Sequence, residues 1–392
     1  MRPLPDADLS LRDAGDFIFD SELCRKALTE PSPPSLGVFL RDVVAGIYRL
    51  TTSCHLPEFT DHGLQHLCSL IDRLSRWTSP GTGNRVERVV AGLEPSECGV
   101  LLLATLFHDI GMLSQRQEDL AEPHSKWESK GRRDVPEWVR ATHVGRMEKL
   151  VKRLFSIGEF PDLLDGPIPQ RAFVVARAHA SWPCQWPQEA FVHRDPGLAA
   201  MLAVADLLDE DSNRCDTATL LRHRQGNYLN CAHWIRHGLS GERVLVEAGN
   251  LHVKLLRPPS TDGQLAPIYR ALRNHYRLSF LYLQELGQVN AGLLNLEFDP
   301  TSGCPMEVAP ELADWSQLPG FKTQSALAFH LLNSFLPEAL LDEQRLKTEQ
   351  LQRLQALGLE NVDLQEFRRV RGTLEFRSRE EQAFQALLGG NE

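Results

Sequence analysis

The stretch LLLATLFHDIGM, residues 101–112, determines how the rest of this chain is interpreted. A helix that is hydrophobic on every face belongs in the middle of a domain. This one ends in His108 and Asp109, and burying an imidazole and a carboxylate is costly unless each finds a partner. Three explanations are open: a buried hydrogen-bond network, a helix end exposed to water, or a metal ion. Only the metal ion predicts further ligands elsewhere in the chain.

Apolar residues recur with a helical period through most of the chain before residue 240, which predicts a mainly α protein. The segment 114–137 is polar and irregular, so we expect a long loop there. The predicted helical segments are 35–50, 64–77, 97–108, 143–155, 172–180 and 197–210.

The pattern changes near residue 243. The stretch RVLVEAGNLHVKLL alternates about Gly249-Asn250 and predicts a β-hairpin. A helical stretch at 268–286 and a candidate strand at 293–298 follow, and the chain then turns helical again. We therefore predict three parts: a helical core at 1–225, a small α+β appendage at 226–320, and a helical C-terminal tail at 321–392.

The bulk composition restricts the class of protein. The 392 residues carry a formal net charge of −10, which argues against nucleic-acid binding over the whole surface. No uninterrupted apolar run reaches the roughly 18 residues of a membrane span, and residues 1–17 lack the apolar core of a signal peptide. The eight cysteines include no C-x-x-C pair, which favours reduced thiols in a cytoplasmic protein. Because the apolar runs are short, we expect no membrane partner.

Histidines and acidic residues recur in an order that suggests a metal site. Imidazole and carboxylate together suit Mn²⁺, Fe²⁺, Co²⁺, Ni²⁺ or Zn²⁺ better than Ca²⁺, and helices that converge in a bundle core are a common source of such ligands. His62 and His66 are four residues apart, which would place both on one face of a helix. The candidate residues are His62, His66, His108, Asp109, His143, His179 and Asp206.

The ordered set resembles the HD-domain metal-dependent phosphohydrolases over roughly residues 46–215. The stretches that carry the resemblance are FTDHGLQH, LFHDIGM, the R-x-x-H formed by Arg140 and His143, ARAHA around His179, and ADLLDEDSNR. A lone HD dipeptide would mean little, whereas the ordered set is specific.

The resemblance implies an HD-domain helical bundle that hydrolyses a phosphate ester of a nucleotide or a related small substrate with metal-activated water. It implies His66, His108, Asp109 and Asp206 as metal ligands. His143 and His179 resemble the subset whose site holds two ions, with Asp109 as the bridging, catalytic carboxylate. In phosphodiesterase relatives, a histidine placed like His62 protonates the leaving oxygen.

The residues themselves support a site at this point. Adjacent helical residues diverge by about 100°, so His108 and Asp109 can both reach an ion at the helix end, and Gly111 would let the chain leave tightly. Other readings stay open: His143 and His179 as substrate-facing or core residues, and His62 as a donor to a carboxylate such as Asp61.

Three arginines are candidate contacts for a phosphate, namely Arg140, Arg177 and Arg214. Arginines in such positions more often pair with acids on neighbouring helices. Trp182 and Trp186, in the segment 181–188, suit either stacking on a nucleobase or burial in a packing cluster.

Two other functions compete with the small-molecule phosphohydrolase. One is a nuclease acting on single-stranded DNA or RNA, against which the acidic balance weighs. The other is a nucleotide-sensing module whose residues 216–392 engage a partner protein or a second copy of the chain. The complete set of candidate ligands favours an enzyme.

Overall fold

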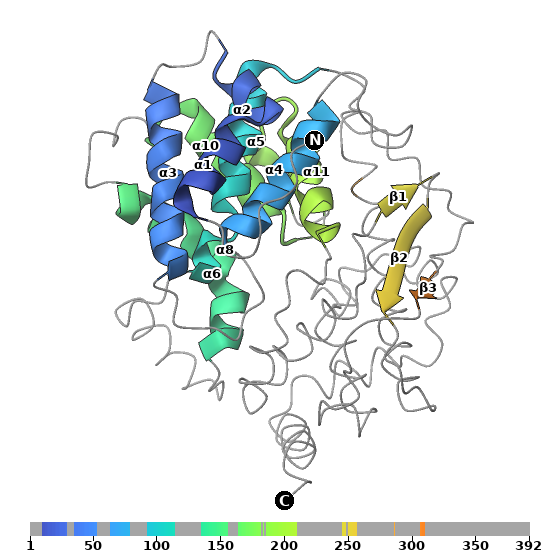
Figure 1. The fold of residues 1–392 in the computed structure, drawn as a ribbon. Coiled ribbons are helices and arrows are strands. Elements are labelled where there is room, and N and C mark those ends of the chain that lie inside the picture. The colour runs from blue at the N-terminus through green and yellow to red at the C-terminus, as the bar shows by residue number, and fades with distance from the viewer. Residues whose placement is uncertain are drawn as a thin grey trace, which may run out of the picture. The chain divides into compact units, whose positions relative to one another are not determined.

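The structure, a computed structural model, describes two separate parts of the chain (Figure 1). The chain forms two compact units, one made of residues 1–56, 61–209 and 284–298, the other of residues 57–60, 210–283 and 299–392. The described residues are 10–29, 35–52, 63–78, 92–113, 135–155, 164–209 except 182, 184 and 185, then 245–247, 250–256, 286 and 306–309.

The described residues of the first unit are mainly helical, which confirms the predicted fold class. Its helices are α1 (Leu11–Phe19), α2 (Glu22–Ala27), α3 (Ser35–Thr52), α4 (Leu64–Thr78), α5 (Pro95–Phe107), α6 (Ile110–Leu113), α8 (Val135–Phe155), α10 (Pro167–Ala178) and α11 (Asp195–Leu207), with the short 3₁₀ helix η2 (Gln188–Ala190).

Helix α5 forms the centre of this unit, and every residue from Glu97 to Phe107 is buried. It packs most extensively against α10 and α2, and the ring of Phe107 stacks on that of Phe173 with centroids 5.3 Å apart. Pro95 stands at the helix start, where a missing N–H is harmless, and the backbone N–H of Glu94 donates to Glu97.

The stretch Pro95–Leu113 is long and apolar enough to cross a membrane, but 94% of it is buried inside the protein. This burial is the expected result for the core helix of a folded domain. The apolar run at 101–107 is therefore explained by packing against other helices.

Several boundaries differ from those predicted. Helix α8 begins at Val135, so residues 135–137 of the predicted loop are helical and the helix starts well before 143. Helices α1 and α2 follow Ser10 and Ser21, whose hydroxyl oxygens accept from backbone N–H groups of the first turn. They are too short for apolar periodicity alone to identify them.

The described part of the second unit is a three-stranded sheet. Strand β1 (Leu245–Glu247) pairs antiparallel with β2 (Asn250–Leu256), which pairs parallel with β3 (Met306–Ala309). The predicted hairpin is confirmed, but Asn250 already pairs with Glu247, so it belongs to β2 and not to the turn. Strand β3 was not predicted.

Other predictions for the C-terminal half fall outside the described residues. These are the candidate strand 293–298, the helical tail 321–392 and, apart from the buried Leu286, the helix 268–286. The domain boundaries at 225 and 320 also lie outside and remain predictions.

Candidate metal centre

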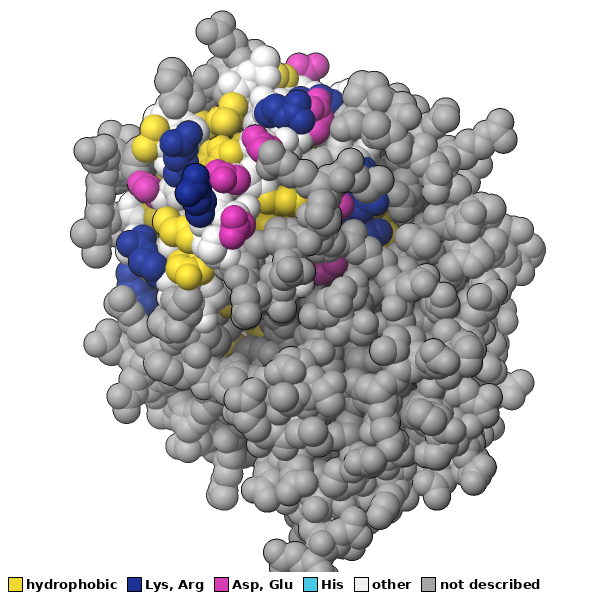
Figure 2. All heavy atoms as spheres, viewed as in Figure 1, with side chains coloured by type: hydrophobic (Ala, Val, Ile, Leu, Met, Phe, Trp, Pro, Cys, Tyr) yellow, Lys and Arg dark blue, Asp and Glu magenta, His cyan; other side chains and the backbone are white. Residues whose placement is uncertain are grey.

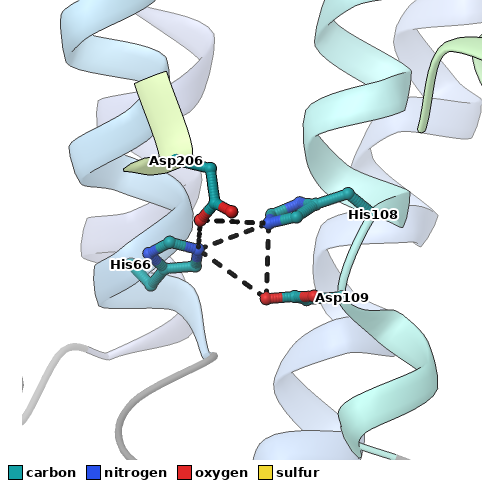
Figure 3. A group of neighbouring side chains, drawn as sticks. All are labelled: His66, His108, Asp109 and Asp206. Atoms are coloured by element: carbon teal, nitrogen blue, oxygen red, sulfur yellow. Dashed lines mark hydrogen bonds and ion pairs between the residues drawn. The ribbon is translucent and has the colours of Figure 1, made fainter. Parts of the chain in front are cut away.

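Four of the candidate ligands converge on one buried point (Figure 3). His66 comes from α4, His108 and Asp109 from the junction of α5 and α6, and Asp206 from the last turn of α11. The Nε2 atom of His66 lies 3.3 Å from Nε2 of His108 and 3.4 Å from Oδ1 of Asp206. The Nε2 atom of His108 lies 3.4 Å from Oδ2 of Asp109. We call these four residues the first group.

The second group consists of Asp109, His143 and His179. His143 belongs to α8, and His179 directly follows α10. Their Nε2 atoms lie 3.6 Å and 3.7 Å, respectively, from Oδ1 of Asp109. Asp109 therefore belongs to both groups: its Oδ2 atom faces His108 of the first group, and its Oδ1 atom faces His143 and His179 of the second.

Three of the histidines have their Nδ1 atom fixed by an acceptor. An acceptor oxygen requires the proton on Nδ1, which leaves Nε2 as the ring atom that can bind an ion at the centre of the site. Metal-binding histidines usually show this arrangement. The pairs are His66 with Asp209 (2.6 Å), His108 with the carbonyl of Thr105 (2.7 Å) and His179 with the carbonyl of Ala176 (2.5 Å).

Gly111 places His143 near the shared carboxylate. A Cβ atom built on Gly111 would lie 2.1 Å from the carbonyl oxygen of His143, so only glycine permits α6 and α8 to approach this closely. We expected Gly111 to allow a tight exit of the chain from the helix. That expectation was wrong, because Gly111 lies within α6 and its role is this close contact.

The surroundings shift the pKa values of two candidate ligands. Removal from water would raise the pKa of Asp206, but its hydrogen bond to His66 and the charges of His108 and His66 hold it below its usual range. Burial would lower the pKa of His179, but its hydrogen bond to Asp109 and the charges of Asp109 and Asp206 raise it above 6.5. The surroundings thus favour the charged form of Asp206 and of His179.

Burial decides one of the alternatives left open by the sequence. His108 is 0% and Asp109 is 7% exposed, so this helix end does not project into water. The polar side chains do form a buried network. That network gathers six side chains that could bind a metal ion around two neighbouring points. Imidazole and carboxylate together are the usual ligands of divalent transition metals. The residues therefore fit a metal ion.

The remaining predicted site residues are placed less clearly. His62 and Arg214 lie outside the described residues, and for Arg140 only the backbone is described, within α8. Arg177 is exposed and forms an ion pair with Glu148 of α8. It therefore follows the structural alternative, in which the arginine pairs with an acid on a neighbouring helix and not with a phosphate. Trp186 is buried and donates to the carbonyl of Ala178 at 2.9 Å, so it packs within the fold; Trp182 is not described.

Sequence reasoning missed Asp209 as a member of the site. The prediction selected Asp206 from the segment DLLDED and gave no role to the carboxylate three residues later. An aspartate about one turn after a candidate ligand, next to an apolar stretch, is the signal that could have identified Asp209. Only the fold shows that its partner is His66.

The sequence profile of the HD-CE family matches residues 56–278, which is more than half of the chain and includes both groups. Comparisons with curated proteins and with solved structures give no match.

Proposed function

Because the chain belongs to the HD-CE family, and because its histidines and aspartates converge as described, we propose that it is a metal-dependent phosphohydrolase. The substrate we propose is a phosphate ester of a nucleotide or of a related small phosphorylated compound. The observation that carries the proposal is the position of Asp109, whose two oxygens face two different sets of histidines.

Each group would hold one divalent ion. The first group offers two imidazoles and two carboxylates, and the second offers two imidazoles and the shared Asp109. Mn²⁺, Fe²⁺, Co²⁺, Ni²⁺ and Zn²⁺ all accept such donors. Two ions in such a site activate a water molecule and stabilise the charge of a phosphate ester.

The residues of the chain prepare the site for this chemistry. The depressed pKa of Asp206 keeps it a carboxylate, the form that binds a cation. Burial of His66 and His108 excludes bulk water, which strengthens their interaction with charged groups. His62 is our candidate for protonating the leaving oxygen, and Arg140 and Arg214 are our candidates for holding the phosphate; Arg177 instead pairs with Glu148.

A small substrate is favoured over a polynucleotide. The net charge is −10, and on the face drawn in Figure 2 the described basic and acidic side chains are interspersed. A long polyanion is usually bound along a continuous basic surface. We also expect a cytoplasmic location, since Cys24 and Cys98 are free and buried thiols.

The test begins with the purified protein and elemental analysis of its metal content. Replacing both His108 and Asp109 by alanine should remove bound metal and hydrolysis while the protein stays helical by circular dichroism. Activity would be screened on nucleotides, cyclic nucleotides, dinucleotides and single-stranded DNA with added Mn²⁺, Co²⁺ or Ni²⁺. Turnover of single-stranded DNA alone would favour the nuclease, and binding without turnover would favour a nucleotide sensor.

A matched control is available in His193, an exposed histidine outside both groups with a φ of 49°. Asparagine tolerates this backbone conformation well, so His193→Asn removes one histidine without new strain. This variant should keep its metal and activity. If the double variant of His108 and Asp109 retains as much metal as His193→Asn, the metal centre is not at the proposed place.

A further inference from the structure

Asp209 lies just beyond the proposed ligands and contacts one of them directly. Its Oδ2 atom lies 2.6 Å from Nδ1 of His66, and its Oδ1 atom accepts a hydrogen bond from the Ser69 hydroxyl. Asp209 is only 2% exposed. A carboxylate so far from water needs strong hydrogen bonds, and one of the two described here is to an imidazole of the first group.

One face of α4 holds this carboxylate in place. His66, Ser69 and Arg73 are spaced at i, i+3 and i+7, which puts them on the same side of the helix. Arg73 donates from Nη2 to the carbonyl of Leu208 at 3.0 Å, and Leu208 is the residue that closes α11. The end of α11 is thus fastened to the face of α4 that carries His66.

This attachment has a consequence for the first group. Asp206 lies three residues before Asp209, so the same end of α11 supplies both Oδ1 of Asp206 near Nε2 of His66 and the carboxylate that contacts Nδ1 of His66. The imidazole is held between two carboxylates, one at each nitrogen. Rotation of the ring would break the contact at Nδ1, so its Nε2 atom keeps one direction.

We propose that Asp209 is a positioning residue, which orients the His66 imidazole and so sets the affinity of the first group for its ion. This inference rests on the proposed function, because it requires His66 to bind metal. Carboxylates that hold metal-binding histidines typically change metal affinity by 10- to 100-fold when they are replaced. The competing explanation is that Asp209 only stabilises the end of α11.

A second buried aspartate of α11 separates these explanations. Asp195 begins the helix, is 0% exposed, and accepts from Arg171 at 2.6 Å and from the backbone of Val192 at 3.0 Å. It contacts neither group of candidate ligands in the interactions described. Asp195→Asn therefore changes a buried carboxylate of the same helix without changing the surroundings of His66.

The experiment titrates metal-free protein with Co²⁺ and follows its ligand-field absorption and the heat of binding. Asp209→Asn should bind Co²⁺ about 10- to 100-fold more weakly at one of two sites, whereas Asp195→Asn should melt at lower temperature with unchanged Co²⁺ affinity. Equal Co²⁺ affinity in Asp209→Asn and the unmodified protein would overturn the inference.

Two further variants complete the test. Ser69→Ala removes one hydrogen-bond donor to Asp209 and retains α4, so it replaces Asp209→Asn if that variant does not fold. Ser69→Ala should also weaken Co²⁺ binding. Unchanged Co²⁺ binding in this variant would again overturn the inference. His108→Ala separates a failure of the proposed metal centre from a failure of the proposed role of Asp209. If His108→Ala leaves Co²⁺ binding intact, the metal centre itself is wrong; if it abolishes binding at the first group and Asp209→Asn does not weaken it, only the role of Asp209 is wrong.

Discussion

The carbonyl oxygen of His143 lies 2.1 Å from the position that a Cβ atom on Gly111 would occupy. The backbones of α6 and α8 are therefore in direct contact, and Arg146 adds a hydrogen bond from Nη1 to the carbonyl of Gly111 at 3.2 Å. This contact holds His143 with its Nε2 atom 3.6 Å from Asp109. The second group of candidate ligands can therefore form only because residue 111 has no side chain.

Gly111→Ala should disrupt the second group. Elsewhere in a helix this substitution is favourable by up to about 1 kcal/mol, but here the methyl group would push α8 away from α6, at a cost of about 1–3 kcal/mol for overpacking. We expect a lower melting temperature and a loss of metal from the second group only. Elemental analysis and calorimetry would measure the two effects.

Gly145→Ala is the matched control for this prediction. Gly145 lies within α8 and is exposed, and among the described residues no atom outside its own helix lies within 4 Å of the position that an added methyl group would take. Alanine there should raise the free energy of unfolding by roughly 0.5–1 kcal/mol and leave the metal content unchanged. If Gly111→Ala is stabilising in the same way, the close approach of the two helices is wrong.

Cys24 and Cys98 should resist alkylation in the folded protein. Burial raises the pKa of each thiol from 9.0 to about 12, and only the thiolate is reactive. Iodoacetamide at pH 8 should modify neither cysteine, as read by mass spectrometry of peptides. The same reagent should modify both after unfolding in guanidinium chloride, and rapid modification of the native protein would contradict their burial.

The same shift predicts a loss of stability in alkaline solution. A folded-state pKa above the unfolded value means that the folded thiol keeps a proton that the unfolded chain releases. The contribution of the two protonated thiols to the stability of the folded protein is fully present below pH 9.0 and is lost as the pH rises toward 12. Cys24→Ser and Cys98→Ser should each reduce this alkaline decline, which urea melts at several pH values would show.

The main helices of the first unit and most candidate ligands could be predicted from the sequence for a physical reason. Apolar residues with a helical period must be buried, and a histidine or aspartate within such a stretch needs a partner. That reasoning identified α5 with His108 and Asp109, and α11 with Asp206, and the fold brings these residues together.

What the sequence did not predict depends on distances between elements. The role of Asp209 follows from its contact with His66, 143 residues earlier in the chain, and no local pattern encodes that pairing. The role of Gly111 follows in the same way from the approach of α8. Strand β3 was missed because four residues are too few to show alternation.

Metal binding at the second group should strengthen as the pH rises. The raised pKa of His179 means that the metal-free protein holds a proton there above pH 6.5, and an ion must displace it. Affinity should therefore fall as the pH drops through this raised pKa. Calorimetric titration with Mn²⁺ in two buffers of different ionisation enthalpy would show the proton release.

The stability of the metal-free protein should change with pH in the opposite direction and fall as the pH rises. Protonated His179 stabilises the folded state fully below pH 6.5, and this contribution is lost as the pH rises through the raised pKa. His179→Gln should remove both the proton release and this loss of stability. Equal proton release in His179→Gln would show that another group carries the proton.

Single replacements of the histidines should separate one ion from two. The Nε2 atoms of His143 and His179 lie 3.6 Å and 3.7 Å from Oδ1 of Asp109, whereas Nε2 of His108 lies 3.4 Å from Oδ2. If each oxygen faces its own ion, His143→Ala or His179→Ala should lower the metal content from about two to about one per chain. His193→Asn should leave it unchanged, and elemental analysis after gel filtration gives the count. Unchanged stoichiometry in His143→Ala and His179→Ala, together with a raised Michaelis constant for the phosphate ester, would make these histidines substrate contacts and leave a single ion at the first group.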